Sequence, residues 1–390
     1  MRAYKYKLQP SAKIIAIFES WLALLCELYN AALAERRDAY RICHQSIGYL
    51  DQANQLPEIK ALRPDLARIH SQVLQNALKR VACAFEHFFR RVKEGQQAGY
   101  PRFRSLSRYD SFTYPGSGFS LKGDQLYLSK IGKVKVRLSR PIEGCIKTCM
   151  IKREADGWYV IFSVRTEVKQ TAPAPQASVG IDVGIEYFAT LSDDQAKPID
   201  NPKYLRCGER ALKKAQRRVS RRIKGSHRRK KAVRLLARQH LKVKRQRRDF
   251  HFKEAKKIVD RYQSITVEDL KVKNMVKNHH LAKSISDAGW SQFIAIVVGK
   301  AAEAGRTVIK VNPAYTSQDC SRCGHRNKIT LATRIYRCSN CGLVLHRDRN
   351  SAKKIEQKGR AVPSRRRKGA SVDEARTYQP AELESPTTTR

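Results

Sequence analysis

Residues 178–194 read SVGIDVGIEYFATLSDD, and their centre is an apolar strand interrupted by one acid, Asp182. Burying a carboxylate in such a run costs several kcal/mol unless a positive group meets it. Residues 187–191 predict a second strand, so Gly184, Ile185 and Glu186 form a tight hairpin turn. An acid at the end of a sheet, capped by backbone amides, is the plainer interpretation. This stretch alone leaves both interpretations open.

Two further acids follow in similar contexts. Residues 264–270 (SITVEDL) alternate apolar side chains and end a predicted strand at Glu268, and Asp348 precedes a short helical pattern in residues 346–352 (HRDRNSA). Three carboxylates that converge would repel one another, so the set is typical of a cation site. Oxygen ligands favour Mg²⁺, with Mn²⁺ as the alternative. Two such ions about 3.5–4 Å apart hydrolyse phosphodiesters in many nucleases.

The overall charge points to a polyanionic partner. The 390 residues contain 79 Lys and Arg against 35 Asp and Glu, a net charge of +44, and this excess favours nucleic acid. A membrane surface is the competing interpretation. We find no apolar run near the roughly 18 residues of a membrane span and no signal peptide at the start, so we expect a cytoplasmic protein that associates with the nucleoid when bound to DNA.

The first half of the chain predicts a helical bundle and a small β domain. Residues 1–8 alternate as a strand, and two long helical patterns follow within residues 11–95. Between residues 100 and 168 the period becomes two, and Asp156-Gly157 marks a hairpin. If the first strand pairs into this sheet, the bundle is an insertion. The Pro/Ala-rich residues 169–177 predict a linker.

A strongly basic stretch follows the first predicted catalytic strands. Residues 210–257 hold 22 Lys and Arg against two acids, on a thin apolar seam broken at Gly225. An ordinary solvated helix face carries both signs of charge, so we interpret this helical hairpin as a nucleic-acid contact, with a solvated helix pair as the alternative. Its representative phosphate-binding residues are Arg217, Arg221, Arg228 and Lys231.

Four of the ten cysteines have metal-ligand spacing. Two CxxC pairs, each followed by Gly, are separated by 14 residues: Cys320, Cys323, Cys338 and Cys341. This spacing predicts a Cys₄ zinc ribbon whose single Zn²⁺ is structural, because four thiolates close the tetrahedron. Redox activity is the rival interpretation. The final residues, from 359 on, are polar without periodicity and predict a disordered tail.

Many motifs together resemble the TnpB family of transposon-encoded, RNA-guided DNA nucleases, relatives of the type V CRISPR effectors. The resemblance covers most of residues 1–356 and includes the stretches MRAYKYKLQP, VGIDVGIEYFATLSD, ITVEDLKVKNM, KSISDAGW, NPAYTSQDCSRCGH and YRCSNCG. It implies that Asp182, Glu268 and Asp348 are RuvC-like catalytic carboxylates holding two Mg²⁺, and that the four cysteines bind zinc. Two positions depart from the family pattern: Ser351 replaces a usual Ala, and His346 a common Asp.

The fold implied is multidomain α+β: an RNase H-like (RuvC) nuclease with an inserted Cys₄ zinc ribbon, preceded by a small β-barrel (wedge) domain with an inserted helical bundle. The expected boundaries are residues 1–10 for the first barrel strand, 11–95 for the recognition bundle, 96–168 for the barrel, 169–177 for the linker, 178–315 for the nuclease with its basic hairpin at 205–262, 316–345 for the ribbon, 346–358 for the last nuclease segment and 359–390 for the tail.

The expected function is Mg²⁺-dependent cleavage of target double-stranded DNA beside a short transposon-adjacent motif, directed by a guide RNA made from the transposon end. Two rivals remain at this point: a guide-RNA-directed repressor without cleavage, and a transposition-associated DNA-binding protein or strand transferase. The intact carboxylate set argues against the repressor, and the lack of a helix-turn-helix signature argues against the transferase. No membrane partner is expected, and the sequence does not predict the oligomeric state.

Overall fold

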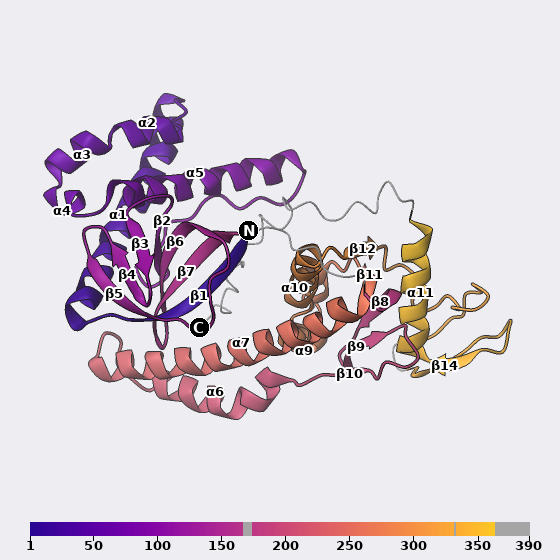
Figure 1. Cartoon of the computed structure of the whole chain (residues 1–390). Helices are drawn as coiled ribbons and strands as arrows, with labels where there is room; N and C mark the ends of the chain where they lie inside the picture. The colour runs from indigo at the N-terminus through magenta and orange to yellow at the C-terminus, as the bar shows by residue number, and fades with distance from the viewer. Residues whose placement is uncertain (167–173, 331–332, 363–390) are drawn as a thin grey trace. The chain divides into compact units, whose positions relative to one another are not determined.

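The computed structural model describes residues 1–166, 174–330 and 333–362, and the chain divides into two compact units, Met1–Glu167 and Val168–Arg390 (Figure 1). Most of the expected linker and of the expected tail lies outside the described residues. Where described, the chain departs from both expectations. A strand already begins at Gln176, and the last helix continues to Ala361, beyond the predicted start of the tail at Gly359.

An antiparallel seven-stranded sheet forms one side of the first unit, with the strand order β2-β6-β7-β1-β5-β4-β3. The first strand pairs with both β5 and β7, so the helices that follow it are an insertion in the sheet, as the sequence predicts. The hairpin at Asp156-Gly157 joins β6 to β7. The paired strands form a linear series with β2 and β3 at its ends. The strands are β1 Arg2–Gln9, β2 Ser111–Tyr114, β3 Phe119–Lys122, β4 Gln125–Leu128, β5 Gly132–Arg137, β6 Cys145–Glu154 and β7 Gly157–Arg165.

Five helices follow β1, and of these α1 and α5 contact the sheet at β2. They are α1 Ala12–Cys43, α2 Tyr49–Asn54, α3 Leu56–Leu62, α4 Pro64–Ala67 and α5 Ser71–Lys93. By length and composition, α1 is apolar enough to cross a membrane, which the search for apolar runs in the sequence did not show. In the fold, however, its Phe18 is fully buried against Phe112 and Trp158 of the sheet. The apolar face of α1 is therefore accounted for by the core of this unit.

A five-stranded mixed sheet organises the second unit, in the order β10-β9-β8-β11-β12. Strand β8 is antiparallel to β9 and parallel to β11, which is parallel to β12. Side chains of β8 and β11 alternate between the two faces of the sheet. The strands are β8 Gln176–Val183, β9 Tyr187–Leu191, β10 Ile199–Asp200, β11 Tyr262–Glu268 and β12 Thr307–Val311.

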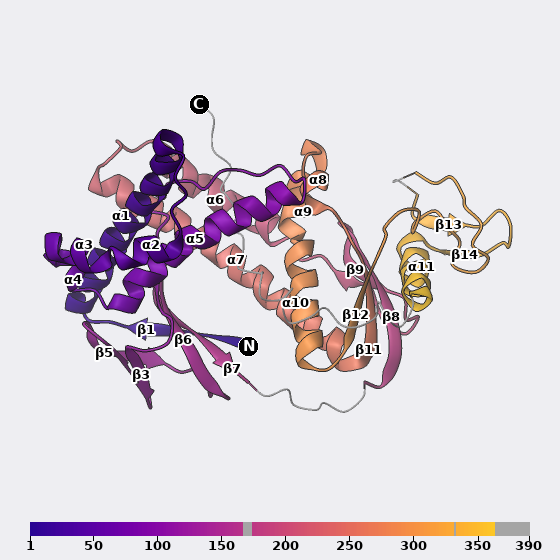
Figure 2. The ribbon, with the colours of Figure 1, turned by 90° about the horizontal axis from the view of Figure 1, so that it is seen from above.

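Helices lie on both faces of this sheet (Figures 1 and 2). On one face, α7 His227–Arg261 and α10 Trp290–Glu303 bury a core with Val179, Ile181 and Ile265. On the other face lies α11 Arg347–Ala361, whose Ile355 packs on β12. The apolar stripes of these helices are what the 3.6-residue period predicts.

Helix α11 approaches the sheet so closely that two positions require glycine. A Cβ on Gly180 of β8 would lie 2.1 Å from the Ala352 carbonyl oxygen, and one on Gly359 of α11 would lie 2.1 Å from Thr266 Oγ1. Backbone therefore packs directly on backbone at Gly180. A larger residue there would push the N-terminal turns of α11 away from β8.

The remaining helices and strands of this unit lie in the segments between the strands of the sheet and before α11. They are α6 Tyr204–Ser220, α8 Val272–Met275, α9 His279–Ala288, β13 Ile335–Arg337 and β14 Val344–His346. The Asp287 side chain accepts hydrogen bonds from the backbone N–H groups of Leu205 and Arg206, at 2.8 and 3.2 Å, and so ties α9 to the start of α6.

Candidate active site and metal centre

The three predicted carboxylates lie on the same face of the five-stranded sheet. Asp182 follows Gly180 by two residues on β8, and Glu268 follows Thr266 by two residues on β11. Since Gly180 and Thr266 both face α11, the alternation of a strand places Asp182 and Glu268 toward α11 as well. Asp348 belongs to the first turn of that helix.

The three residues also lie at the same end of the sheet. Val267 pairs with Ile181, so Glu268 stands next to Asp182 at the carboxyl ends of two parallel strands. Helix α11 runs in the opposite direction to β8, because Glu356 meets Ser178 near the start of the strand and Ala352 meets Gly180 farther along it. The N-terminal turn of α11, with Asp348, therefore reaches the strand ends that carry the other two acids.

The negative charges of Glu268 and Asp348 act directly on Asp182. Burial and these two charges raise the pKa of Asp182 well above its usual range, and the charge of the nearby Arg347 opposes them. Burial also raises the pKa of Glu268, against the lowering effect of a hydrogen bond from Thr316 and of the Lys358 charge. Asp348 is buried at 7% exposure. Such a concentration of negative charge is unfavourable without a cation.

Two protein groups partly compensate this charge. The Arg347 guanidinium contacts Asp348 Oδ1 at 3.1 Å, and the Thr316 hydroxyl donates to Glu268 Oε1 at 2.6 Å. The oxygens of the three carboxylates do not all lie within 4.8 Å of one another, the spacing expected around a single ion. Within the described residues, the one group of His, Cys, Asp or Glu ligand atoms that meets this spacing is formed by cysteines. A pair of cations about 3.5–4 Å apart distributes its ligands over a wider space than one ion does.

That cysteine group is the predicted one. The Sγ atoms of Cys320, Cys323, Cys338 and Cys341 all lie within 4.8 Å of one another, with 3.6 Å between Cys320 and Cys341 and between Cys323 and Cys338. The short strands β13 and β14 and the buried Tyr336 support the second pair. The Cys₄ cluster is compatible with a zinc site, and its four sulfur atoms leave no position for substrate.

The predicted basic hairpin consists of α6 and α7, which pack along each other (Figure 1). Leu212, Ala215 and Val219 are buried between the helices, as the apolar seam predicts, together with Ala232 and Val243. The four predicted phosphate-binding residues are exposed, and in the described part of the chain their side chains make no hydrogen bond or ion pair: Arg217, Arg221, Arg228 and Lys231. Since α7 ends at Arg261 and β11 begins at Tyr262, the hairpin leads directly into the strand that carries Glu268.

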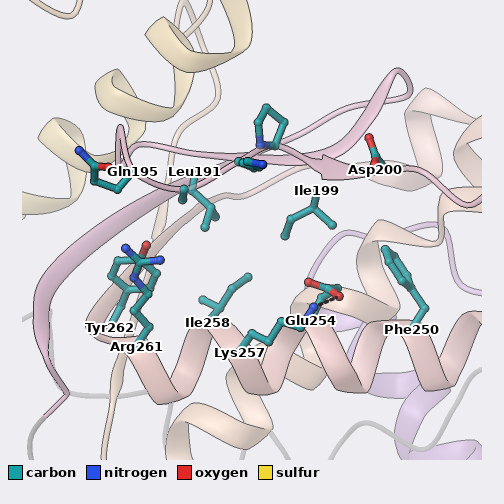
Figure 3. A pocket seen from close by; sticks show the side chains of 13 residues that line it. Leu191, Gln195, Ile199, Asp200, Phe250, Glu254, Lys257, Ile258, Arg261 and Tyr262 are labelled. Carbon is teal, nitrogen blue, oxygen red and sulfur yellow. Dashed lines mark hydrogen bonds and ion pairs between the residues drawn. The ribbon is translucent and has the colours of Figure 1, made fainter.

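A separate pocket of about 460 Å³ lies between α7 and the β9–β10 connection (Figure 3). Its apolar lining includes Leu191, Ile199 and Ile258, and its Glu254 is paired with Lys257 at 2.8 Å. None of the three carboxylates lines it. The pocket is therefore distinct from the candidate active site.

Sequence reasoning did not identify three residues near the carboxylates. Arg347 stands beside Asp348 in the quoted motif, Thr316 comes shortly before the first CxxC pair, and Asn350 is fully buried one turn into α11. Arg347 was the most accessible of these to prediction, because a cation adjacent to a proposed catalytic acid is visible in the sequence. The other two act through hydrogen bonds between distant segments, which leave no periodic signal.

Comparison with known proteins shows where the chain belongs. A family profile described as "Probable transposase" (OrfB_IS605) matches residues 161–279, and one described as "Cas12f1-like, TNB domain" matches residues 290–355. The protein named "Putative RNA-guided DNA endonuclease" of Streptomyces pristinaespiralis is 34% identical over 93% of this chain and 90% of its own length. The chain belongs to the TnpB family.

Other relatives agree with this family. A protein of Escherichia coli (strain K12) named "Putative RNA-guided DNA endonuclease InsQ" is 31% identical over 93% of both chains. The fold resembles a chain in the "Cryo-EM structure of the Cas12f1-sgRNA-target DNA complex", with a TM-score of 0.58 at 15% identity over 88% of this chain and 83% of that one. The family and the fold thus agree with the resemblance that the motifs indicate.

Proposed function

We propose that this protein is an RNA-guided DNA endonuclease of transposon origin, and that Asp182, Glu268 and Asp348 are its catalytic carboxylates. The observation that carries the proposal is the convergence of these acids from β8, β11 and α11, with the pKa of Asp182 raised by burial and by the charges of the other two. Membership of a family whose members are named RNA-guided DNA endonucleases supports it. A DNA-binding protein without cleavage would not need this unfavourable charge.

The carboxylates suit a pair of Mg²⁺ ions, with Mn²⁺ as a substitute. All three are hard oxygen donors, and the concentration of negative charge around Asp182 is what a divalent ion would relieve. Bound metal would supply charge stabilisation for in-line attack of water on the scissile phosphate. Asp182, on which both other charges act, would be one of the residues that hold this metal, together with Glu268 and Asp348.

The other side chains around the site orient these acids. Thr316 holds one Glu268 oxygen at 2.6 Å, which leaves the other oxygen for a metal. Arg347 lies beside Asp348 at 3.1 Å and limits the repulsion between the acids. The cysteines would hold one structural Zn²⁺.

The finer fold assignment is part of the same proposal. The order of the mixed sheet, with an antiparallel hairpin β8–β9 followed by parallel β11 and β12, supports an RNase H-like (RuvC) nuclease. The first unit corresponds to the wedge barrel, and its inserted helices α1 to α5 correspond to the recognition bundle. The antiparallel sheet and the pairing of β1 with β5 and β7 support this correspondence.

The partners proposed are a guide RNA from the transposon end and target double-stranded DNA. A chain of similar fold was solved in a complex with sgRNA and target DNA, and this chain carries a net charge of +44 and exposed cations along α6 and α7. Base pairing by the guide would read the target, while the protein contacts backbone and a short flanking motif. The proposed location is the cytoplasm, at the nucleoid when DNA is bound.

A cleavage assay tests the proposal against its rival. The protein is co-expressed with RNA from the end of its own transposon, and the complex is given a plasmid library with a matched target beside randomised flanking bases. We expect Mg²⁺-dependent cleavage of plasmids that carry one flanking motif. Target binding without any cleavage, in Mg²⁺ or Mn²⁺, would instead support the guide-directed repressor.

A further inference from the structure

The segment between β12 and the first cysteine pair touches the strand that carries Glu268. Thr316 in this segment is buried at 3% exposure, and its hydroxyl lies 2.6 Å from Glu268 Oε1. The same hydroxyl is 2.9 Å from the Pro313 carbonyl oxygen, but it has only one proton to donate. The contact with Glu268 is the shorter one and gains from the charge of the carboxylate.

The next residues of the segment are held by helix α11. Asn350 is fully buried, and its side chain bonds the backbone on both sides of Cys320: Oδ1 accepts from Ser321 N–H at 2.9 Å, and Nδ2 donates to the Asp319 carbonyl at 3.0 Å. Ser351 Oγ lies 3.2 Å from Ser317 Oγ. Asn350 comes two residues after Asp348, on the same first turns of the helix.

We propose that residues 316–321 form a clasp that fixes Glu268 relative to Asp348, so that the cysteine ribbon determines how tightly the carboxylate site binds its divalent metal. The inference rests on the proposed function, since it takes these two acids as metal ligands. Thr316 and Asn350 are positioning residues in this arrangement, and neither takes part in the reaction itself.

Electrostatics explains why such a clasp is needed. Glu268 and Asp348 come from a strand and a helix, and both act on Asp182, so repulsion favours their separation whenever metal is absent. Within the clasp, Thr316 bonds Glu268, and Ser321 bonds Asn350 of the helix that carries Asp348. Both bonds are therefore made by the same six-residue segment. Because Cys320 stands between the two backbone groups that Asn350 holds, folding of the ribbon around zinc keeps the segment in place.

The test separates metal affinity from folding. Thr316→Val removes the donor at nearly constant volume, and Thr316→Ser retains the donor. Mn²⁺ binding to the purified guide-RNA complex is measured by electron paramagnetic resonance, with zinc content, thermal unfolding and RNA affinity measured alongside. We expect Thr316→Val to weaken Mn²⁺ binding about tenfold, which is the effect of one hydrogen bond to a charged group. Thr316→Ser should stay within about twofold of wild type.

Cleavage provides the second measurement. With Thr316→Val, the Mg²⁺ concentration for half-maximal cleavage should rise about tenfold, and the rate should recover at saturating Mg²⁺. A merely structural role predicts a lower melting temperature with unchanged metal affinity, and that result overturns the clasp. If the Thr316→Val variant does not fold, Mn²⁺ affinity is measured instead on the wild-type complex from which a chelator has removed the zinc. An unchanged Mn²⁺ affinity of that zinc-free complex would also overturn the clasp.

A third variant distinguishes failure of the clasp from failure of the proposed function. Glu268→Gln should abolish cleavage if Glu268 is a metal ligand. Wild-type cleavage by Glu268→Gln would contradict the proposed function itself. An inactive Glu268→Gln together with unchanged Mn²⁺ affinity in Thr316→Val would contradict the clasp alone.

Discussion

The carboxylate site and the α6–α7 hairpin are both concentrations of like charge, but they differ in burial. Asp182, Glu268 and Asp348 meet at one end of a sheet, where burial and mutual repulsion raise the pKa of Asp182. The cations of the hairpin are spread over two long helices, and Arg217 and Lys231, for example, are exposed to solvent.

This difference indicates two different kinds of partner. Like charges that converge in a buried place need a compact, multivalent counterion, because water cannot screen them. Like charges spread along an exposed surface cost little in water and match a long polyanion, whose condensed counterions are released on binding. We therefore expect the two regions to respond to different experiments: the first to metal, and the second to salt.

The largest effect is expected from removing the central acid. Asp182→Ala should reduce Mg²⁺-dependent cleavage by about 10³-fold or more, since several kcal/mol of transition-state stabilisation depend on the metal site. RNA affinity should stay within a few-fold of wild type. The matched control is Asp194→Ala in the same stretch, because Asp194 is exposed and pairs with Lys353 at 2.8 Å. Plasmid cleavage by Asp182→Ala at the control's rate would remove Asp182 from the site.

The cysteine ribbon is a third place where identical side chains gather, and like the carboxylate site it should depend on a bound metal ion. Cys338→Ser should lose zinc and loosen residues 316–345, because a closed Cys₄ site supplies folding energy to a module with a small core. Elemental analysis measures zinc per chain. The control is Cys207→Ser, an exposed cysteine outside the cluster, which should retain the metal. Equal zinc in both variants would argue against a zinc site.

The hairpin tests the other side of the comparison. Changing Arg217, Arg221, Arg228 and Lys231 to Gln should flatten the slope of log RNA affinity against log salt by about 0.7–0.9 units for each lost phosphate contact. The effect should be the same for any RNA of the same shape, since phosphate contacts carry no base information. Filter binding across a salt series gives the slope.

A matched control for this experiment lies on α7, the helix that also carries Arg228 and Lys231. Lys253, Lys256 and Lys257 of α7 already pair with Asp249, Asp260 and Glu254. Changing these three lysines to Gln should alter the slope less per residue than changing the four unpaired cations. Equal changes per residue in both sets would mean that only the total charge of the protein matters.

The smallest expected effect concerns stability without metal. Because the pKa of Asp182 is raised in the folded protein, the folded protein binds more protons than the unfolded chain at pH values between the two pKa values. The free energy of unfolding therefore falls as the pH rises from the ordinary Asp pKa of about 3.9 toward the pKa in the folded protein. Asp182→Asn should remove this loss and raise the melting temperature near neutral pH, in buffer without added Mg²⁺ or Mn²⁺, by about 2–4 °C for each kcal/mol gained. A pH series of thermal unfolding in that buffer tests this. Unchanged or lower stability of the variant would mean that Arg347 already neutralises the site.

Much of the local structure is determined by the sequence alone, because each pattern reflects contacts within a few residues. The strand–turn–strand around Asp182, the strand ending at Glu268 and the hairpin at Asp156-Gly157 all form where alternation and turn residues predict them. The Cys₄ cluster likewise follows from spacing, since two CxxC pairs leave few other ways to satisfy four thiols. The assignment of the catalytic acids, however, stays a prediction until the variants are measured.

Only the tertiary structure decided how these pieces meet. The sequence does not show that α11 lies antiparallel on β8, close enough to require Gly180 and to bring Asp348 to the strand ends. Nor does it show that Thr316 reaches Glu268, that Asn350 holds both sides of Cys320, or that Asp287 ties α9 to α6. The physical reason is the same in each case. Such contacts join residues tens or hundreds of positions apart, and a hydrogen bond between distant segments imposes no period on the chain that contains it.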